Sequence, residues 1–387
     1  MGHTAQKFDL GDAFRMSIGT LDTAAPRIEV DASRHFAEWL RDANVSLGLS
    51  TYQSGKLFLV GHRVVEETRE IRPAVFERTF ERVMGLCSDG QSLWMSTAWQ
   101  LWRLENDLSP GEEWNGYDRN FVPRRSYVTG EVDVHDLGVD ANGRLVFVNT
   151  LFGCLATTSE KHSFEPLWKP SFVSKLAPED RCHLNGLAWE HGQPKFVTVC
   201  GRTDVFDGWR ACRAGGGALL DVTAEGGDAE VVATGLSMPH SPRLHAGKVW
   251  LLDSGTGYLG YVDPAKGAFE RVAFCPGFAR GLAIHAGHAI VGLSQSRKEK
   301  TFGGLPLGEE LAKRNAEPMC GLMVIDLSTG DTKHWLRVGG VVEELYDVIA
   351  LPGVKRPRLV GFQSSEVRHR VTYETEGGEK RWLAEER

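Results

Sequence analysis

Short apolar segments alternate with polar turns along most of the chain and recur in one design. In residues 133–150, two apolar segments flank a polar turn, and the second segment ends in a polar residue. The same design returns at 83–97, 183–200, 239–254, 279–294 and 345–363. Apolar segments of this length, bounded by turn residues, predict β-strands. The chain therefore contains six copies of one predicted two-strand unit.

One position is equivalent in all six copies when they are aligned on their first apolar pair. Its occupants are Met84, His135, Asn185, His240, Arg280 and Tyr346, separated by 51, 50, 55, 40 and 66 residues. A repeat of roughly 40 to 50 residues with all-β content is typical of the β-propeller, whose blades are four-stranded sheets. Blades bury their faces by stacking around an axis, which the first strand of each blade lines. We therefore expect these six residues to meet at one end of a central channel.

The two ends of the repeat region complement each other. Residues 45–52, 56–60 and 74–80 are predicted strands of a blade that lacks its first strand locally, whereas the copy at 345–363 has early strands and little after them. Pairing the two ends closes the ring and protects an open sheet edge. The prediction is a six-bladed β-propeller; because 46–51 and 357–362 both resemble second strands, a seventh, partial blade is the alternative.

The remaining segments divide into flanks and insertions. We expect a surface tail over 1–30, an amphipathic helix over 31–44 packed outside the propeller, a single propeller domain over 45–365 and a C-terminal tail over 366–387. Two long insertions, 201–217 and 296–318, follow second strands, and the latter includes a predicted short helix at 309–315. Insertions of this length are usually lids or binding loops; the alternative is that both are solvent-exposed loops without a function.

Composition narrows the classes of function. Of the 387 residues, 42% are apolar and 25% charged, as in ordinary globular proteins. The net charge of −7 and the absence of a basic run argue against nucleic-acid binding. With neither a leader-like N-terminus nor an apolar run of about 18 residues, we expect a cytoplasmic protein without membrane contact. The seven cysteines lack C-x-x-C spacing, which disfavours a zinc ribbon or a disulfide framework.

The histidines supply the candidate chemistry. His135, His183 and His240 come from three different repeats and belong to the same inner layer. Three imidazoles and a carboxylate suit a divalent metal such as zinc, iron, manganese or copper. Glu344 is the candidate carboxylate, since it precedes Tyr346 by two residues just as His183 precedes Asn185. The alternative is that the histidines only form hydrogen bonds across a polar channel.

Other candidate residues fit substrate binding and acid–base chemistry. Arg280 is expected to hold an anionic group of the substrate, with Glu344 or Tyr346 as acid or base. Further candidates for binding the substrate share proximity to the channel mouth: Asn185, Arg82, Arg202, Trp209 and Arg210. The alternative for Arg280 is an ion pair with Glu344 or Asp133. Asp136 and Asp347, which directly follow channel positions, are expected to satisfy backbone donors instead.

Several motifs resemble an uncharacterised bacterial family of conserved hypothetical proteins. They are TYQSGK at 51–56, CHLNGLA at 182–188, LSMPHSPR at 236–243, LDSGTG at 252–257 and VVEELYDV at 341–348, and the resemblance extends from about residue 35 to 365. More distantly, the repeats resemble six-bladed gluconolactonases and strictosidine synthases. The resemblance to gluconolactonases implies an axial divalent cation held by Glu, Asn and Asp. Asn185 and Glu344 match that pattern and the histidines depart from it, which disfavours calcium and lactonase activity.

Two functions remain open. The first is a metal-dependent enzyme that acts on a small polar or anionic molecule or a peptide side chain, as a hydrolase, lyase or oxidoreductase. The second is a propeller without catalytic activity that binds a partner protein or peptide through its funnel or rim, with incidental histidines. An exposed aromatic rim around a charge-paired axis would favour binding.

Overall fold

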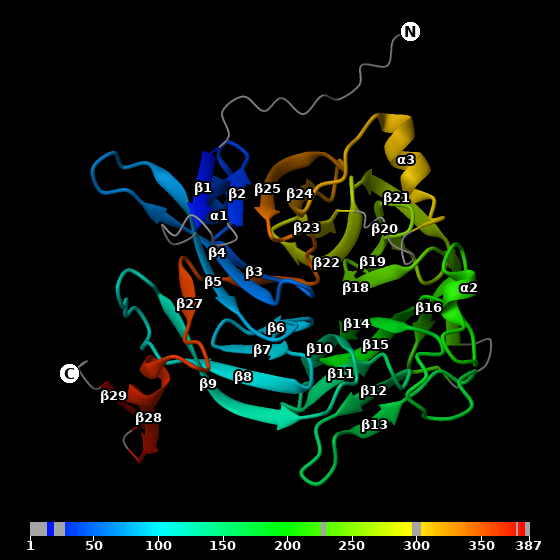
Figure 1. Ribbon diagram of the computed structural model, residues 1–387, viewed down its shortest axis with the longest axis horizontal. Coiled ribbons are helices and arrows are strands. Elements are labelled where there is room, and N and C mark those ends of the chain that lie inside the picture. The colour runs from blue at the N-terminus through cyan, green and yellow to red at the C-terminus, as the bar shows by residue number, and fades with distance from the viewer. Residues whose placement is uncertain are drawn as a thin grey trace.

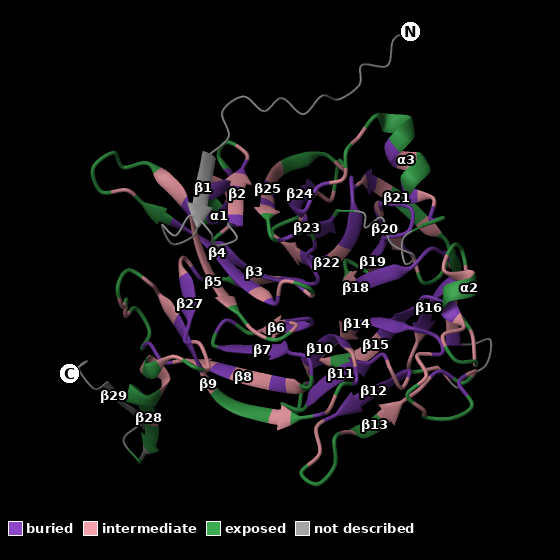
Figure 2. Cartoon of the chain, viewed as in Figure 1, coloured by how far each residue is buried: buried purple, intermediate pink, exposed green. Residues whose placement is uncertain are grey.

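Six sheets form a closed ring around a central axis (Figure 1). The computed structural model describes residues 14–18, 28–224, 226, 230–295, 303–376 and 378–383. Each sheet has four strands that run outward from the axis in chain order, apart from the additions and the closure described below. The predicted six-bladed β-propeller is therefore confirmed. Figure 2 shows buried residues concentrated on the inner strands and exposed residues on the peripheral segments.

The first four blades are continuous in the chain. The strands of each blade are given from the axis outward. Blade 1 consists of β6 (Leu86–Ser88), β7 (Ser92–Ser96), β8 (Gln100–Asn106) and β9 (Arg119–Val128), and blade 2 of β10 (Val134–Val139), β11 (Leu145–Asn149), β12 (Cys154–Thr157) and β13 (Glu165–Trp168). Blade 3 consists of β14 (Leu184–Glu190), β15 (Gln193–Val199), β16 (Gly217–Asp221) and β17 (Val231–Leu236), and blade 4 of β18 (Pro239–His245), β19 (Lys248–Asp253), β20 (Tyr258–Val262) and β21 (Phe269–Phe274).

Blades 5 and 6 use both ends of the chain. Blade 5 consists of β22 (Phe278–His285), β23 (His288–Ser294), β24 (Gly321–Asp326) and β25 (Thr332–Gly340), extended by β2 (Ile28–Ala32) and β1 (Phe14–Ile18). In blade 6, the inner strand β26 (Val348–Pro352) pairs with β3 (Val45–Ser50), followed by β4 (Lys56–Val64) and β5 (Ile71–Thr79). This pairing confirms the predicted closure of the ring by its two ends.

The prediction that residues 357–362 form a second strand of a blade was wrong. In the structure β27 (Pro357–Leu359) runs parallel to β9 as an outer fifth strand of blade 1. Residues 45–50 are the second strand of blade 6, so no seventh blade forms among the described residues. The sequence shows the apolar character of 357–362 but not which neighbour it pairs with.

Both predicted tails contain structure. Within 1–30, β1 and the beginning of β2 extend blade 5 through β25, while 1–13 and 19–27 lie outside the described residues. Helix α1 (Phe36–Asp42) lies within the range predicted for a helix, and its buried face packs on blades 5 and 6. Within 366–387, the 3-10 helix η2 (Ser365–His369) leads into the hairpin of β28 (Arg370–Thr375) and β29 (Gly378–Leu383). No helix of the described residues is long and apolar enough to cross a membrane.

A residue with a left-handed backbone conformation precedes or begins the inner strand in four blades. Arg82, Asp133, His183 and Met238 each precede the channel position by two residues, and each has a φ between 48° and 56°. This left-handed conformation is unfavourable for residues other than glycine, so its recurrence marks a conserved turn within the repeat. In blades 2, 3 and 4 the inner strand then shifts register against the second strand, as in a β-bulge. Together the turn and the bulge direct the channel residues toward the axis.

A hydroxyl at the end of the second strand links neighbouring blades. In five of the six blades this hydroxyl donates to a backbone carbonyl at the start of the next blade's inner strand. The bonds are Ser50 to Met84 (2.6 Å), Ser96 to Val134 (3.2 Å), Thr150 to Leu184 (2.7 Å), Ser254 to Ala279 (2.6 Å) and Ser294 to Leu345 (3.0 Å). We call these five side chains the hydroxyl ring. In blade 3 the position is occupied by Cys200, whose Sγ accepts from Asn185 Nδ2 at 3.6 Å.

An arginine closes the axis below the channel residues. Arg243 Nη1 donates to Asp136 Oδ2 at 2.9 Å and to the carbonyl of Leu187 at 3.1 Å, and its Nε donates to the carbonyl of Leu282 at 2.9 Å. Asp136 and Asp347 also accept from backbone N–H groups of neighbouring blades, at Leu187 and Leu86 respectively. The predicted structural role of the two aspartates is confirmed.

The hydroxyl ring should contribute measurably to stability. Ser294→Ala removes the acceptor of Leu345 N–H (3.2 Å) and the donor to Leu345 C=O, both of which are buried. Leaving such groups without partners costs about 1–3 kcal/mol, so we expect the free energy of unfolding to fall by that amount in urea titrations. Ser126→Ala, on an exposed position of β9, is the control and should change it by less than about 0.5 kcal/mol. Equal effects in the two variants would contradict the role of the ring.

Candidate functional site

The structure brings together most of the inner-layer residues that the sequence predicted. The rings of His135 and His183 have their centroids 4.8 Å apart, and those of His135 and Tyr346 lie 5.4 Å apart. The guanidinium carbon of Arg280 is 4.9 Å from the centroid of Tyr346, and Arg280 Nε is 3.2 Å from His240 Nε2. We call these five residues the axial cluster. All but Arg280 are more than nine-tenths buried.

Hydrogen bonds fix the protonation of two imidazoles. His135 Nδ1 lies 3.0 Å from the carbonyl oxygen of Asp133 and 2.8 Å from Thr150 Oγ1. His240 Nδ1 lies 2.8 Å from the carbonyl oxygen of Met238 and 3.0 Å from Ser254 Oγ. A carbonyl oxygen can only accept, so each Nδ1 carries the proton. The Nε2 atom of each neutral ring is therefore an acceptor, and in His240 it accepts from Arg280.

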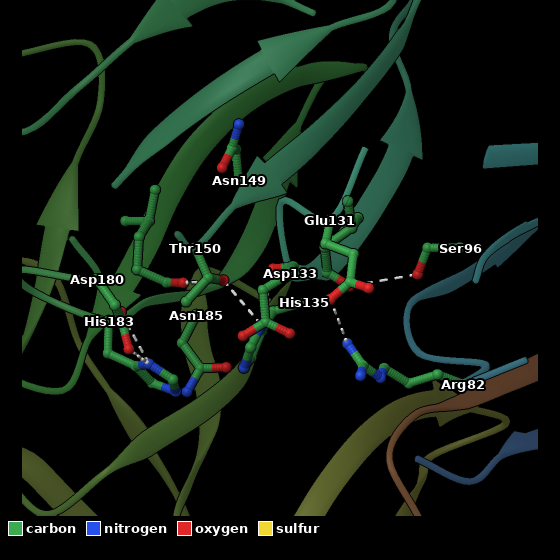
Figure 3. Close-up of polar contacts among 12 residues, drawn as sticks. Arg82, Ser96, Glu131, Asp133, His135, Asn149, Thr150, Asp180, His183 and Asn185 are labelled. Carbon is green, nitrogen blue, oxygen red and sulfur yellow. Dashed lines mark hydrogen bonds and ion pairs between the residues drawn. The ribbon is translucent and has the colours of Figure 1, made fainter. Parts of the chain in front are cut away.

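His183 is oriented by a carboxylate, as Figure 3 shows. Its Nδ1 lies 2.8 Å and 3.0 Å from the two carboxylate oxygens of Asp180, and it therefore carries a proton. Asp180 also accepts from Trp209 Nε1 at 2.8 Å, and the Trp209 ring stacks on His183 with centroids 4.1 Å apart. His183 Nε2 is buried and has no hydrogen-bond partner among the described residues. A carboxylate–imidazole pair with a free Nε2 is the arrangement of a general base.

Burial favours the uncharged forms of His135, His240 and Tyr346. The pKa of His135 is lowered from 6.5 to about 4, chiefly by burial; Asp133 opposes the shift, and the neighbouring His183 and Arg280 add to it. Burial and then the charge of Arg280 hold the pKa of His240 well below its ordinary value. Burial raises the pKa of Tyr346 well above 10. His135 and His240 therefore act as neutral acceptors near pH 7, and the Tyr346 hydroxyl keeps its proton.

Two buried polar atoms of the cluster have no hydrogen-bond partner among the described residues. Besides His183 Nε2, the buried hydroxyl of Tyr346 has none within the described part of the chain. A buried donor or acceptor left unpaired costs about 1–3 kcal/mol. Such groups mark places where a ligand or a water molecule completes the hydrogen bonding.

The residues at the solvent-facing end of the axial cluster, which we call its mouth, are polar and include positively and negatively charged side chains. Arg82 pairs with Glu131 at 3.5 Å, as Figure 3 shows, and its guanidinium carbon lies 5.3 Å from the ring centroid of Tyr52. Tyr52 in turn stacks on Tyr346, with centroids 5.9 Å apart. The side chain of Asp133 is 35% exposed, whereas that of the neighbouring His135 is 5% exposed. Arg82 therefore lies outside the axial cluster, and its role in binding the substrate stays a prediction.

Glu344 and Asn185 make hydrogen bonds outside the axial cluster. Glu344 Oε1 accepts from the backbone N–H of Gln53 at 2.8 Å, and Asn185 Nδ2 donates to Cys200 Sγ. Both side chains are buried. Neither contact places the carboxylate of Glu344 on an imidazole, and its assignment as acid or base stays a prediction. The ion pair considered for Arg280 with Glu344 or Asp133 is replaced by the contact with His240.

The two insertions meet at the rim. Helix α2 (Trp209–Cys212) belongs to the first and α3 (Leu307–Arg314) to the second, whose residues 296–302 lie outside the described part. Arg213 Nη2 donates to the carbonyl of Gly303 at 2.6 Å. Side chains from both insertions and from the inner strands form one apolar cluster: Cys200, Trp209, Met238, Phe278, Leu305, Leu307 and Leu311. This cluster holds Trp209 against His183.

The two arginines predicted on the first insertion contact side chains outside the axial cluster. Arg210 pairs with Asp207 at 3.0 Å and lies over Trp209, with 4.4 Å between the guanidinium carbon and the ring centroid. Arg202 lies 6.0 Å from the centroid of Phe172. Trp209 is 2% exposed and supports His183 instead of presenting its face to a ligand. Asp180 was not predicted from the sequence, where its position three residues before His183 was the available signal.

The three imidazoles fit a metal poorly in this arrangement. Arg280 donates to the Nε2 atom that His240 would offer to a cation, and a guanidinium at that distance repels a divalent ion. Among the described residues, no group of three or more His, Cys, Asp or Glu side chains is placed to hold a metal. All seven cysteines lie within the described residues and are free thiols.

Comparison with known proteins identifies a family but no activity. Residues 34–360 match the model of the family described as Domain of unknown function (DUF4915). No curated protein sequence gives a significant match. Similar solved structures include a nidogen/laminin complex, with 10% identity, coverage of 80% of this chain and 99% of that chain, and a TM-score of 0.49. A protein of unknown function from Bacteroides caccae has 10% identity, coverage of 79% and 98%, and a TM-score of 0.45.

The low pKa of His135 predicts a loss of stability in acid. The unfolded chain binds a proton at this histidine more tightly than the folded protein does. The stabilising contribution is therefore present above pH 6.5 and is lost as the pH falls from 6.5 to about 4. The shift corresponds to roughly 3 kcal/mol. In urea titrations over this range, His135→Gln should reduce the loss of stability on acidification.

The control is His162→Gln, which replaces an exposed histidine in a turn. It should leave the pH dependence of the free energy of unfolding as in the unaltered protein. An equally steep dependence in His135→Gln would show that His135 does not titrate in this range.

Proposed function

Because the chain belongs to the family described as Domain of unknown function (DUF4915), we propose a function from its own geometry: an enzyme that uses acid–base chemistry at the axial cluster on a small molecule with an anionic group. The observation that carries this proposal is the pair of unpartnered buried polar atoms, His183 Nε2 and the Tyr346 hydroxyl. Both belong to one cluster, in which His135 contacts each ring. A bound substrate would supply a donor for the first and an acceptor for the second.

His183 is the proposed general base. Its Nδ1–H is held by Asp180, which orients the ring and stabilises the imidazolium that forms when Nε2 takes a proton. The proton comes from bound water in a hydrolysis or from the substrate itself in an elimination. Stacking on Trp209 fixes the plane of the ring, so that Nε2 is presented in one direction. Preorganisation of this kind is worth several kcal/mol in the transition state.

Arg280 is the proposed anchor for the anionic group. It is the positively charged member of the axial cluster, and it lies against Tyr346 and Phe278, with the guanidinium carbon 4.9 Å and 5.4 Å from their ring centroids. The bond to His240 Nε2 holds the guanidinium in place through its Nε. A planar guanidinium held in this way suits a carboxylate or phosphate. The Tyr346 hydroxyl would donate to the same group or to a developing negative charge.

A binding module is the second candidate, and one observation favours it. The first insertion exposes Val205 and Phe206 at 63% and 69%, beside the mouth of the channel. Exposed apolar residues on a rim loop suit contact with a protein or peptide. The enzyme proposal is preferred because this surface does not account for the unpaired atoms of the axial cluster. Phe206→Ser would abolish partner binding in this second case and leave turnover of a small molecule unchanged in the first.

The two proposed roles, binding of the anionic group by Arg280 and general-base action by His183, can be tested separately. A panel of small carboxylates and phosphate monoesters is screened against the unaltered protein for binding by ligand-observed NMR and for conversion by mass spectrometry. For a molecule that is converted, Arg280→Gln should weaken binding by about 10- to 100-fold. His183→Gln should retain affinity within a few-fold but lose about 10²- to 10⁴-fold in turnover. Arg271→Gln, on the exposed outer strand β21, is the matched control.

Loss of binding and turnover to the same extent in both variants would contradict separate roles. If no panel member binds the unaltered protein, or if binding persists unchanged in Arg280→Gln, an anionic substrate at the axial cluster is ruled out.

A divalent metal at the axial cluster is a separate prediction with its own test. Elemental analysis by mass spectrometry is made on protein purified without a histidine tag and on the double variant His135→Ala/His240→Ala. Near-stoichiometric metal in the unaltered protein that is lost from a folded double variant would establish the site. It would also require Arg280 to leave His240, because the two now share a hydrogen bond. Metal-free protein after reconstitution with zinc, iron, manganese or copper would contradict the prediction.

A further inference from the structure

A cavity opens at the end of the axis opposite the axial cluster, beyond Arg243. Its volume is about 390 Å³. Four inner strands, β6, β10, β22 and β26, supply most of its walls, and Trp189 of β14 supplies another part. We call this cavity the rear pocket. The side chains used below are Arg243 and Asp136 at its floor and Leu137, Ile284, Ala350 and Trp189 in its walls.

The floor of the rear pocket offers a hydrogen-bond donor. Nε and Nη1 of Arg243 are engaged by the carbonyls of Leu282 and Leu187 and by Asp136. Its Nη2 lies 3.8 Å from Asp347 Oδ1, beyond hydrogen-bond distance, and donates to no other group among the described residues. The side chain of Arg243 is 23% exposed although it lies on the axis, because it faces this cavity. The N–H groups of Nη2 are therefore available to an acceptor.

The charges around Arg243 decide which acceptor fits. The guanidinium lies between Asp136 and Asp347, so its positive charge is already balanced. Burial and the neighbouring Asp136 raise the pKa of Asp347 to about 7. A ligand with a negative charge would add a further anion beside Asp136, which already balances the guanidinium. An uncharged oxygen can accept from Nη2 without that repulsion.

The walls of the rear pocket are mostly apolar and therefore favour a ligand with an apolar body. Leucine, valine, isoleucine, alanine and tryptophan side chains make up most of the lining. A mostly apolar cavity with a few convergent polar groups is typical of small-molecule sites, whose volumes begin near 300 Å³. The cavity therefore has room for a ligand of one or two rings.

We propose that the rear pocket binds a small uncharged molecule with an apolar body and one carbonyl group, whose oxygen accepts a hydrogen bond from Arg243 Nη2. This site is separate from the axial cluster and does not rest on the proposed function. The ligand class is an apolar amide, ketone or ester. Arg243 stands between the two ends of the channel, so the ligand enters from the face opposite the insertions.

Three probes of similar size separate the contributions. Acetanilide carries a neutral carbonyl, phenylacetate carries a carboxylate, and ethylbenzene carries no acceptor. Titrations of the full-length protein are followed by ligand-observed NMR. We expect acetanilide to bind at least about tenfold more tightly than either of the other two, since a hydrogen bond to a charged donor is worth about 1.5–3 kcal/mol.

Variants locate the binding. Ala350→Phe fills the pocket from the wall of β26 and should abolish acetanilide binding, and Val139→Trp does the same from β10 should the first variant fail to fold. Arg280→Gln, at the other end of the axis, should leave acetanilide binding unchanged. Tightest binding of phenylacetate, undiminished binding in the filled variants, or no saturable binding of acetanilide would each overturn the proposal.

Discussion

A guanidinium on the axis, shared among the blades, holds the ring together. Arg243 belongs to blade 4, and its side chain bonds to Asp136 of blade 2 and to carbonyls of blades 3 and 5. Asp347 of blade 6 lies next to it and accepts from a backbone N–H of blade 1, so all six blades are connected through this one position. Burying a charge is costly unless its partners are well placed. Here the partners are backbone and carboxylate groups at the point where every inner strand passes closest to the axis.

The site is built from the same parts that join the blades. Thr150 and Ser254 each donate to the next blade's backbone and accept from the Nδ1–H of an axial histidine. One hydroxyl thus links two blades and sets the direction of one imidazole. The orientation of His135 and His240 is therefore a property of the closed ring, whereas His183 depends on Asp180 and on the insertion that carries Trp209. The orientation of His183 is therefore the part of the site that the closed ring alone does not set.

The fold could be predicted from the sequence because each blade repeats one apolar pattern in phase. That pattern also placed His135, His240, Arg280 and Tyr346 in one layer, since equivalent positions of a propeller face one axis. The partners of these residues could not be predicted in the same way. Arg280 bonds to a histidine and not to a carboxylate, and the pairing of 357–359 with blade 1 depends on chain geometry outside the repeats. The insertions do not follow the repeated strand pattern, so the stacking of Trp209 on His183 could not be predicted from that pattern.

The closure of blade 6 constrains how the protein folds during synthesis. Strand β3 leaves the ribosome early, but its inner partner β26 is made about 300 residues later. At about 5–20 residues per second, the inner edge of β3 waits roughly 15–60 s for that partner. An unpaired edge of this kind invites pairing with other chains. The nascent chain therefore carries its greatest risk of aggregation until the last blade is complete, and its N-terminal half cannot fold to its final form first.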